Sequence, residues 1–404
     1  MTTLWDAQAI ILKIVSKLPA EVVPLMESPG RVLAEAVHAP WDLPLVDNTA
    51  MDGYAVKSVD CTAGASLRVT GYSPAGASTY EEVRSGEALR IMTGAPIPAG
   101  ADAVVPIEES VENGDQVSFI DKVKQGQHIR FKGEDFKSGE QVLAEGALIR
   151  PADINMLASL GRALVPVYRI PRVAIVATGD ELVELGMRPE PGQVINSNSL
   201  AVAAAVRELG AIPILAGIAR DTPESHRSVL SAALNADIVI TSAGVSAGDR
   251  DLVRDILAEI GVIQHFWKVA VKPGGPTAFG VLGRVPVFSL PGNPVSTLLT
   301  FEVMVRPAIL KMMGHRSLFK TPLRAILEEE ARPRRDKLNI LRVRLYERGE
   351  RFYAASSGDQ KTGFLKTLVA ANGYILLEPG DAPLTSGVEV DVYLLGERQM
   401  MRGV

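Results

Sequence analysis

The stretch Val173-Ala-Ile-Val-Ala177, followed at once by Thr178-Gly-Asp-Glu181, decides the fold of this chain. A continuous apolar run that leads into a glycine-containing loop is typical of a strand buried on both faces of a sheet. Outward from it, strand-like and helix-like segments alternate. We expect strands at 212–215, 237–240, 266–271 and 285–290, and helices at 200–209, 223–234, 252–260 and 294–313. The alternation predicts a mostly parallel sheet, so residues 171–320 are predicted to form a doubly wound α/β domain.

The segments on either side of this domain have other patterns. Residues 39–139 hold short apolar runs, at 67–69, 88–92, 103–107 and 116–120, between frequent Gly and Pro residues, which indicates a β-rich domain. Residues 321–404 hold strand-like runs at 340–346, 352–355, 374–377 and 389–395, which are typical of a small β-barrel. Nearer the N-terminus, we expect helices at 4–18 and 31–38 and a further helix that begins at Pro151.

The composition narrows the class of protein. The chain has 404 residues, of which 47% are apolar and 22% are charged, as in soluble multidomain proteins. Its formal net charge of −5 argues against a general nucleic-acid-binding protein, and its apolar runs are too short to span a membrane. The single cysteine, Cys61, cannot form an internal disulfide, and the five histidines have no zinc-finger spacing. Because the N-terminus lacks signal-peptide features, we expect a cytoplasmic protein with no nucleic-acid or membrane partner.

Three loops at the carboxyl ends of predicted strands are candidates for binding an anion. They are Thr178–Glu181, Thr241–Asp249 and Pro291–Ser296, and all three lead into helical segments. Backbone N–H groups at a helix start bind anions, and glycine lets phosphate approach the chain. Since ligands of open α/β sheets bind at this edge, we expect a phosphate-binding crevice there, although the same residues also serve to turn the chain. The candidate residues within these loops include Gly244, Ser246, Gly292 and Ser296.

Charged residues are expected at the same edge. Lys268 and Lys272 are four residues apart, so on one strand they would face the same side, where a bound anion would offset their repulsion. A solvated strand end is the alternative interpretation. The carboxylates of Glu181, Asp221 and Asp251 are hard oxygen ligands that suit Mg²⁺ beside a phosphate. Asp221 would equally serve as a helix N-cap, and Asp251 would complement a helix dipole.

The stretch Gly244-Val-Ser-Ala-Gly248 matches the G-x-S-x-G nucleophile elbow of hydrolases. A catalytic triad would need a later histidine. His265 lies inside an apolar run, and His315 lies beyond the predicted helix 294–313. Ser246 is therefore interpreted as a hydrogen-bond donor to an anion, and hydrolase chemistry is not favoured.

Seven short motifs follow one another along the chain: Ala50-Met-Asp-Gly-Tyr-Ala55, Met92-Thr-Gly-Ala-Pro96, Gly133-Glu-Asp135, Thr178-Gly-Asp-Glu181, Gly244-Val-Ser246, Lys272-Pro-Gly274 and Leu290-Pro-Gly-Asn-Pro-Val-Ser296. Together and in this order they resemble the molybdopterin molybdenumtransferase family, which includes the bacterial MoeA proteins and the C-terminal domain of gephyrin. The resemblance covers essentially the whole chain. It implies an elongated N-terminal domain from residues 1–38 and 140–170, the β-rich domain 39–139, the α/β domain 171–320 and the C-terminal β-barrel 321–404.

The resemblance also implies a reaction of molybdenum cofactor biosynthesis. Molybdate, as a substrate, would be inserted into adenylylated molybdopterin with release of AMP, in a step assisted by Mg²⁺. The protein would be a homodimer whose site combines the α/β domain with the partner's β-rich domain, and it would work with a molybdopterin adenylyltransferase and with acceptor molybdoenzymes. The motifs carry over catalytic roles to Asp52, Asp135, Glu181, Asp221 and Asp251, metal binding to the last three, and substrate binding to Thr93, Lys268, Lys272, Pro291, Pro294 and Thr362.

Three positions depart from the usual family pattern. Gly275 stands where a lysine is frequent, Ala243 stands in place of a glycine, and Gln360-Lys361-Thr362 replaces Gln-Gly-Ser. Lys361 could supply the charge that Gly275 lacks, and the departures leave a tungstate-inserting paralogue open.

Two other functions stay open at this point. The α/β domain also resembles molybdopterin adenylyltransferases, which are typically built around that domain alone. A non-catalytic scaffold of the gephyrin type would dock an acidic partner through the basic run from Arg332 to Arg351, although nearby glutamates favour a solvated strand face.

Overall fold

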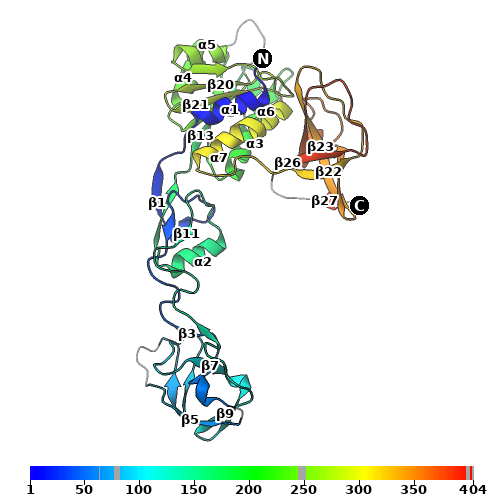
Figure 1. Cartoon of the computed structure of the whole chain (residues 1–404). Coiled ribbons are helices and arrows are strands. Elements are labelled where there is room, and N and C mark those ends of the chain that lie inside the picture. Colours follow the sequence, from blue (N-terminus) through cyan, green and yellow to red (C-terminus); the bar gives the residue numbers. More distant parts are fainter. Residues whose placement is uncertain (63, 77–81, 244–251, 397–400, 403–404) are drawn as a thin grey trace. The chain divides into compact units, whose positions relative to one another are not determined.

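The computed structural model describes residues 1–62, 64–76, 82–243, 252–396 and 401–402. The chain forms two compact units. The first consists of Met1–Ala34, Gly146–Arg150 and Leu164–Val404, and the second consists of Glu35–Glu145 and Pro151–Ala163. Figure 1 labels the main elements of both. The α/β and barrel portions of the chain both lie in the first unit.

The α/β portion is built on a six-stranded sheet in the order β16-β13-β17-β21-β20-β18. The first four strands run parallel, and β20 and β18 are antiparallel to their neighbours. The doubly wound, mostly parallel sheet predicted from the sequence is confirmed. The strands are Ile212–Ala219 (β16), Arg172–Thr178 (β13), Ile238–Ser242 (β17), Val285–Leu290 (β21), Ala278–Leu282 (β20) and Ile263–Phe266 (β18).

Helices cover both faces of this sheet (Figure 1). Alternate residues of β13 explain why its sequence is apolar throughout, because Val173 and Ile175 belong to one core cluster and Ala174 and Val176 belong to the other. The first cluster includes residues of α1 (Leu4–Ile14), α3 (Ser197–Glu208), α6 (Pro294–Thr300) and α7 (Arg306–Met312). The second includes residues of α4 (Pro223–Ala233) and α5 (Leu252–Glu259).

The predicted helix 294–313 is interrupted by a π-helical turn, Phe301–Val305, between α6 and α7. Here the backbone N–H of Arg306 donates to the carbonyl of Phe301, one residue further back than in an α-helix. The next residue, Pro307, has no N–H to donate, so the usual α-helical hydrogen bond is lost at this point.

Two further predictions from the sequence are wrong. The predicted strand 266–271 is two strands, because the chain turns back at Val271, whose N–H donates to the carbonyl of Val269, and β19 (Val271–Lys272) leaves the α/β sheet. The predicted helix 31–38 is extended, because its backbone bonds to other segments: Leu33 N–H donates to the carbonyl of Ala147, and β2 (Val37–His38) pairs with β11 (Gln141–Leu143). Local apolar spacing does not reveal such long-range partners.

The C-terminal portion is a closed five-stranded barrel, as predicted. Its strands pair in a ring, β22-β24-β23-β25-β26, and β26 pairs with β22 again. The ring joins the α/β portion through β19, whose Lys272 pairs with Asn339 of β23. The barrel strands are Leu323–Leu327 (β22), Leu338–Arg348 (β23), Arg351–Ser356 (β24), Gly373–Leu377 (β25) and Glu389–Leu394 (β26).

The second unit is β-rich, as predicted, and contains a six-stranded sheet in the order β7-β4-β6-β5-β9-β8. Its core gathers apolar side chains of several strands around the fully buried Tyr54. The helix predicted from Pro151 is α2 (Pro151–Ser159). The strands of the sheet are Ala103–Pro106 (β7), Gly53–Val56 (β4), Glu87–Ile91 (β6), Ser66–Ser73 (β5), Gln116–Phe119 (β9) and Ser110–Asn113 (β8).

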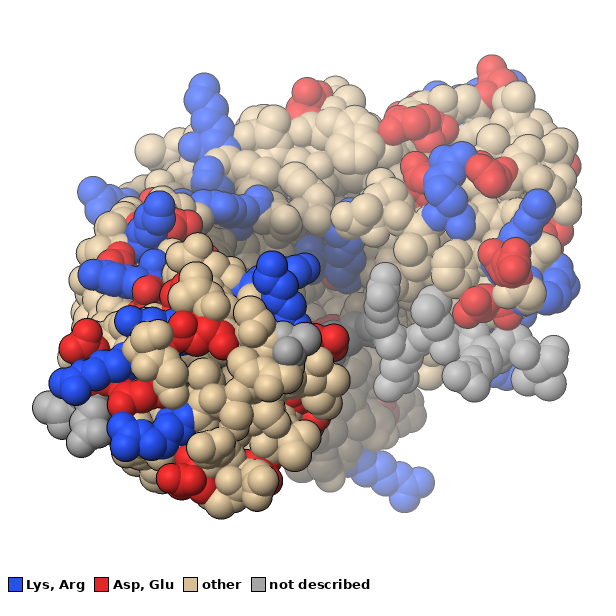
Figure 2. Space-filling view, turned by 60° about the horizontal axis from the view of Figure 1, so that its bottom comes forward, with Lys and Arg blue, Asp and Glu red and all other residues tan. Residues whose placement is uncertain are grey.

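Charges of both signs lie on the surface of the protein. On the face shown in Figure 2, Lys and Arg side chains are interspersed with Asp and Glu side chains, in keeping with the net charge of −5. Within the described ranges, none of the helices has both the length and the hydropathy needed to cross a bilayer.

Candidate functional site

The carboxyl edge of the parallel strands holds a cavity of about 500 Å³. We call it the first cavity. The loops after β13, β17 and β21 all contribute to its wall, as expected for a ligand site of an open α/β sheet. The start of α3 completes the wall, so backbone N–H groups of a helix N-terminus lie at the cavity. Its lining residues are Glu181, Leu182, Val194, Ile195, Asn196, Ser197, Asn198, Ser242, Ala243, Pro276, Pro291, Gly292, Asn293 and Pro294.

Asn198 ties three walls of the first cavity together. From α3, its side-chain Nδ2 donates to Ser242 Oγ at the end of β17, 3.1 Å away, and to the carbonyl of Gly292, 2.7 Å away. At the start of the same helix, the side chain of Asn196 accepts a hydrogen bond from the backbone N–H of Ser199 and caps the helix. The two asparagines therefore fix the shape of the cavity wall.

Ala243 adopts a backbone conformation that favours glycine. Its φ is +76°, in the left-handed region, where a β-carbon costs free energy. A β-carbon added to Gly292 would lie 3.1 Å from the Cβ of Ala243, so the two loops approach each other closely at the cavity wall. The alanine at this position, which departs from the family pattern, therefore introduces local strain at the cavity.

A turn after β13 presents Glu181 and is held by the turn after β16. The Asp180 N–H donates to Asp221 Oδ2 at 3.3 Å, and the Asp221 N–H donates to Asp180 Oδ1 at 3.1 Å. Arg220 Nη1 donates to the carbonyls of Gly179, Asp180 and Leu182, at 3.4, 3.2 and 2.9 Å. This reciprocal arrangement brings the exposed residues Glu181 and Asp221 onto adjoining turns.

The carboxylates of these turns suit Mg²⁺. Mg²⁺ prefers carboxylate and phosphate oxygens and commonly takes one or two protein carboxylates, with water and phosphate oxygens completing its shell. Glu181 and Asp221 supply two such groups, whereas Asp251, the third predicted ligand, lies outside the described residues. Among the side chains that are described, no group of three or more Asp, Glu, His or Cys residues could hold a metal ion. The donors present fit a metal that shares its ligands with a substrate phosphate.

Only some of the other predicted site residues of the α/β domain line the first cavity. Pro291, Gly292 and Pro294 line the first cavity, but Ser296 is buried in α6 and does not line it. Lys268 and Lys272 are exposed, and the expectation that one strand carries both is wrong because the chain turns between them. Gly244 and Ser246, with the rest of the loop 244–251, lie outside the described residues.

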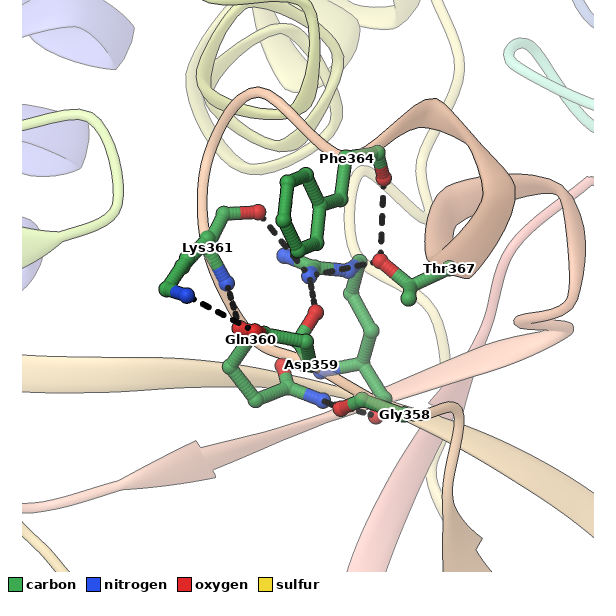
Figure 3. Close-up of polar contacts among 7 residues, drawn as sticks. Gly358, Asp359, Gln360, Lys361, Phe364 and Thr367 are labelled. Carbon is green, nitrogen blue, oxygen red and sulfur yellow. Dashed lines mark hydrogen bonds and ion pairs between the residues drawn. The ribbon is translucent and has the colours of Figure 1, made fainter.

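Arg342 of β23 is fully buried beside the loop that leads to α8 (Leu365–Val369). Its Nη2 donates to the carbonyl of Asp359 at 2.8 Å and to Thr367 Oγ1 at 2.9 Å, while Nε and Nη1 have no partner among the described residues. The nearby carboxylate of Asp359 pairs instead with Lys361, whose Nζ lies 3.2 Å from Asp359 Oδ2 (Figure 3). Burial lowers the pKa of the Arg342 guanidinium.

A buried guanidinium without a carboxylate is costly, and an anion that reached it would offset the cost. Thr362 and Lys361 lie in the same loop, and Arg342 Nη2 also donates to the Lys361 carbonyl at 3.4 Å. The following helix, α8, contacts α6, which begins at the lining residue Pro294. This loop is thus a candidate oxyanion site, and it leads to a helix that contacts α6.

The second unit holds Asp52, Thr93 and Asp135. Asp52 Oδ1 accepts hydrogen bonds from the Thr93 hydroxyl at 2.6 Å and from the Thr93 N–H at 2.7 Å. These two bonds lower the pKa of Asp52 below its usual value. Asp135 is exposed, and its N–H donates to the carbonyl of Leu43 at 3.0 Å.

Sequence reasoning did not identify Asn196, Asn198 or Arg342. The position of Asn196 just before an apolar helix is an N-cap signal, and it could have been read from the sequence. Asn198 and Arg342 gave no such signal, because one acts through bonds to remote loops and the other is recognisable only by its burial.

Comparisons with known proteins cover nearly the whole chain. Residues 2–161 match the family model described as MoeA N-terminal region (domain I and II), residues 174–311 match the probable molybdopterin binding domain, and residues 324–395 match the MoeA C-terminal region (domain IV).

Curated relatives agree with these matches. The chain is similar to a molybdopterin molybdenumtransferase of Haemophilus influenzae, with 38% identity over 98% of this chain and 100% of the relative. It is also similar to molybdopterin molybdenumtransferase 2 of Mycobacterium tuberculosis, with 36% identity over 97% and 99%. Among solved structures, the molybdopterin biosynthesis moeA protein of Pyrococcus horikoshii OT3 matches with a TM-score of 0.84 and 31% identity, over 98% of this chain and 100% of that one.

Proposed function

Since this chain belongs to the molybdopterin molybdenumtransferase family, a transferase family of molybdenum cofactor biosynthesis, we propose that it inserts molybdate into adenylylated molybdopterin and releases AMP, with assistance from Mg²⁺. The observation that carries the proposal is the first cavity. Its wall combines the N-terminus of α3, the loop Pro291–Pro294 and the carboxylate residue Glu181 at one edge of the sheet.

The first cavity suits a phosphorylated ring system. Its volume of about 500 Å³ is in the range of small-molecule sites. The N-terminus of α3 favours a phosphate group, and the amides and hydroxyls in its wall offer hydrogen bonds to the polar edge of a pterin. Asn198 keeps the Gly292 loop in place, so the donors are oriented before the substrate binds.

Glu181 and Asp221, together with Asp251, would hold Mg²⁺ beside the pyrophosphate. When bound there, Mg²⁺ polarises the pyrophosphate and stabilises negative charge on the departing AMP. Arg220 keeps the Glu181 turn fixed through the three carbonyls that it binds. The reaction needs no covalent nucleophile. This agrees with the interpretation of Ser246 as a hydrogen-bond donor and not as the nucleophile of a hydrolase.

Molybdate would bind at the loop around Arg342. The dianion offers oxygen acceptors to Nε and Nη1 of Arg342, the two guanidinium nitrogens that lack partners among the described atoms. Thr362 and the exposed Lys268, Lys272 and Lys361 would add donors and positive charge. Lys361 would do so after leaving Asp359, which holds its ammonium group in the absence of an anion.

We extend the proposal to a homodimer, in which Asp52, Thr93 and Asp135 take part in the reaction. Expectations of cytoplasmic location, of an adenylyltransferase partner and of acceptor molybdoenzymes stay predictions.

The proposal is tested by measuring AMP release from adenylylated molybdopterin by the purified full chain. We expect AMP release that requires both molybdate and Mg²⁺ and that is strongly reduced, with measurable residual activity, in Glu181→Gln. A parallel reaction contains molybdopterin and ATP without preformed adenylate. Rapid adenylate formation in that reaction, without molybdate-dependent AMP release in the first, would identify an adenylyltransferase and refute the proposal. Replacing molybdate by tungstate shows which oxyanion the site prefers.

A further inference from the structure

A second cavity, of about 360 Å³, lies on the same α/β sheet between α5 and the strands β18, β20 and β21. We propose that this second cavity binds the purine ring of the adenylyl group, an inference that rests on the proposed function. The nucleotide half of the substrate would therefore have a ring site of its own, apart from the first cavity.

Apolar residues of the sheet line part of the second cavity. Val287 of β21 is almost completely buried there, with 2% of its surface exposed, whereas Phe279 of β20 borders the cavity but packs its ring with Phe266 and Phe288 on the other face of the sheet. The small residues Ala258, Ala278 and Gly280 also line the cavity. We call this space the slot, because its small and apolar lining residues leave room for a planar, uncharged ring.

The rim of the slot carries groups that recognise heteroaromatic rings. The guanidinium carbon of Arg254 lies 5.0 Å from the ring centroid of Trp267, so the two lining residues form a cation–aromatic pair. Bases stack readily on indole rings and on guanidinium planes. Asp255 and Gln264, both exposed, offer a carboxylate and an amide oxygen as acceptors for a ring amino group. The Gln264 amide nitrogen is already fixed, because it donates to the Phe266 carbonyl at 3.1 Å.

Strand β21 links the two cavities. Ser289, which lines the second cavity, is the penultimate residue of β21, and Pro291, which lines the first, follows two residues later. Two residues of extended chain span about 7 Å. A substrate with two ring systems joined through a pyrophosphate can therefore place one ring in each cavity and the phosphates between them.

The lining residues decide which ring goes where. Asn196, Asn198, Ser242 and Asn293 make the wall of the first cavity rich in amides and hydroxyls, which suits the many donors and acceptors of a pterin. The second cavity offers the Trp267 indole and the Arg254 guanidinium for stacking, which suits a purine. AMP, which lacks the pterin, is therefore expected to bind at Trp267.

The test measures binding of AMP and of ribose 5-phosphate to the full chain by calorimetry, with no turnover. Ala258→Phe places a ring in the slot, and Ala232→Phe is the matched control, since Ala232 is an exposed alanine of α4 outside the slot. We expect AMP to bind more tightly than ribose 5-phosphate, to bind at least tenfold more weakly in Ala258→Phe, and to bind unchanged in Ala232→Phe. AMP should also change the fluorescence of the wild type but not of Trp267→Leu, which serves as the second variant if Ala258→Phe does not fold.

Equal affinities for AMP in the wild type, Ala258→Phe and Trp267→Leu would overturn the inference, and so would the absence of AMP binding to the wild type. Failure of the proposed function has a different signature. In that case the wild type would release no AMP from adenylylated molybdopterin with molybdate, whatever the two variants do to AMP binding.

Discussion

Gly179→Ala perturbs the turn that presents Glu181, and its effect can be worked out from the structure. Gly179 has a φ of +135°, a conformation that residues with a β-carbon rarely adopt. A β-carbon there would lie 2.3 Å from Glu181 Oε2 and 2.6 Å from Oε1. An ordinary contact begins at about 3.4 Å, so the carboxylate would have to move by about 1 Å.

The expected result has two parts. The strained backbone should lower the free energy of unfolding by about 1–3 kcal/mol. A displacement of about 1 Å at a reacting centre should slow the release of AMP by roughly 10- to 100-fold. The assay is single-turnover AMP release from adenylylated molybdopterin with saturating molybdate and Mg²⁺, together with a thermal melt of each variant.

The matched control is Gly186→Ala, which also has a positive φ, +93°, but whose added β-carbon would meet nothing within 4 Å. It should show a comparable loss of stability with nearly normal AMP release. In a Glu181→Ala background, Gly179→Ala should cause little further loss of activity, because the group that it displaces is already absent. Equal activity losses in the two glycine variants, or an undiminished effect in the Glu181→Ala background, would refute this reasoning.

Three further predictions concern other parts of the site. Arg342→Met should leave the melting temperature unchanged or raise it, because it removes a buried guanidinium that lacks a carboxylate, while it should abolish molybdate-dependent AMP release; a marked loss of stability would contradict the unpaired state of the guanidinium. Thr93→Val should raise the carboxyl pKa of Asp52 toward 3.8, measured by NMR titration, whereas Thr93→Ser should not. A titration of Thr93→Val that does not differ from that of the wild type would contradict this prediction. Because folding lowers the pKa of Asp52, the contribution of Asp52 to stability is complete above the pKa of the unfolded state and is lost as the pH falls through the pKa of the folded state. Ala243→Gly should relieve about 1 kcal/mol of left-handed strain and raise the melting temperature, and a lower one would show that Ala243 is unstrained.

The sequence predicts the α/β portion well because its signals are local and strong. The apolar run Val173–Ala177 must be a strand buried on both faces, and glycines such as Gly210 and Gly261 mark helix ends. The strands at 67–69, 88–92, 103–107 and 116–120 are recovered for the same reason. Each of these elements is defined by its own side chains.

Prediction fails where remote segments decide the conformation. Residues 31–34 have helical spacing, yet they are extended because their backbone groups bond to residues 146–149 and 166–168. Lys268 and Lys272 have strand spacing, but Val271 turns back to Val269 and the chain then joins the barrel.

The same difference between local signals and remote partners explains which residues of the candidate site could be predicted from the sequence. Glu181, Pro291 and Pro294 could be placed because they follow predicted strands at a known edge of the sheet. Asn198 and Arg342 could not, since the role of each depends on partners that only the folded chain brings together. The second cavity was missed for this reason as well, because its slot is formed by α5, β18, β20 and β21 together.

The central claim is that the first cavity holds the phosphorylated pterin. It is tested most directly by a crystal structure of the full chain soaked with adenylylated molybdopterin and Mg²⁺ but without molybdate. The account predicts density for the pterin and its phosphate against the start of α3 and the Gly292 loop. Well-defined pterin density at any other place, with the wall around Asn198 unoccupied, would contradict it.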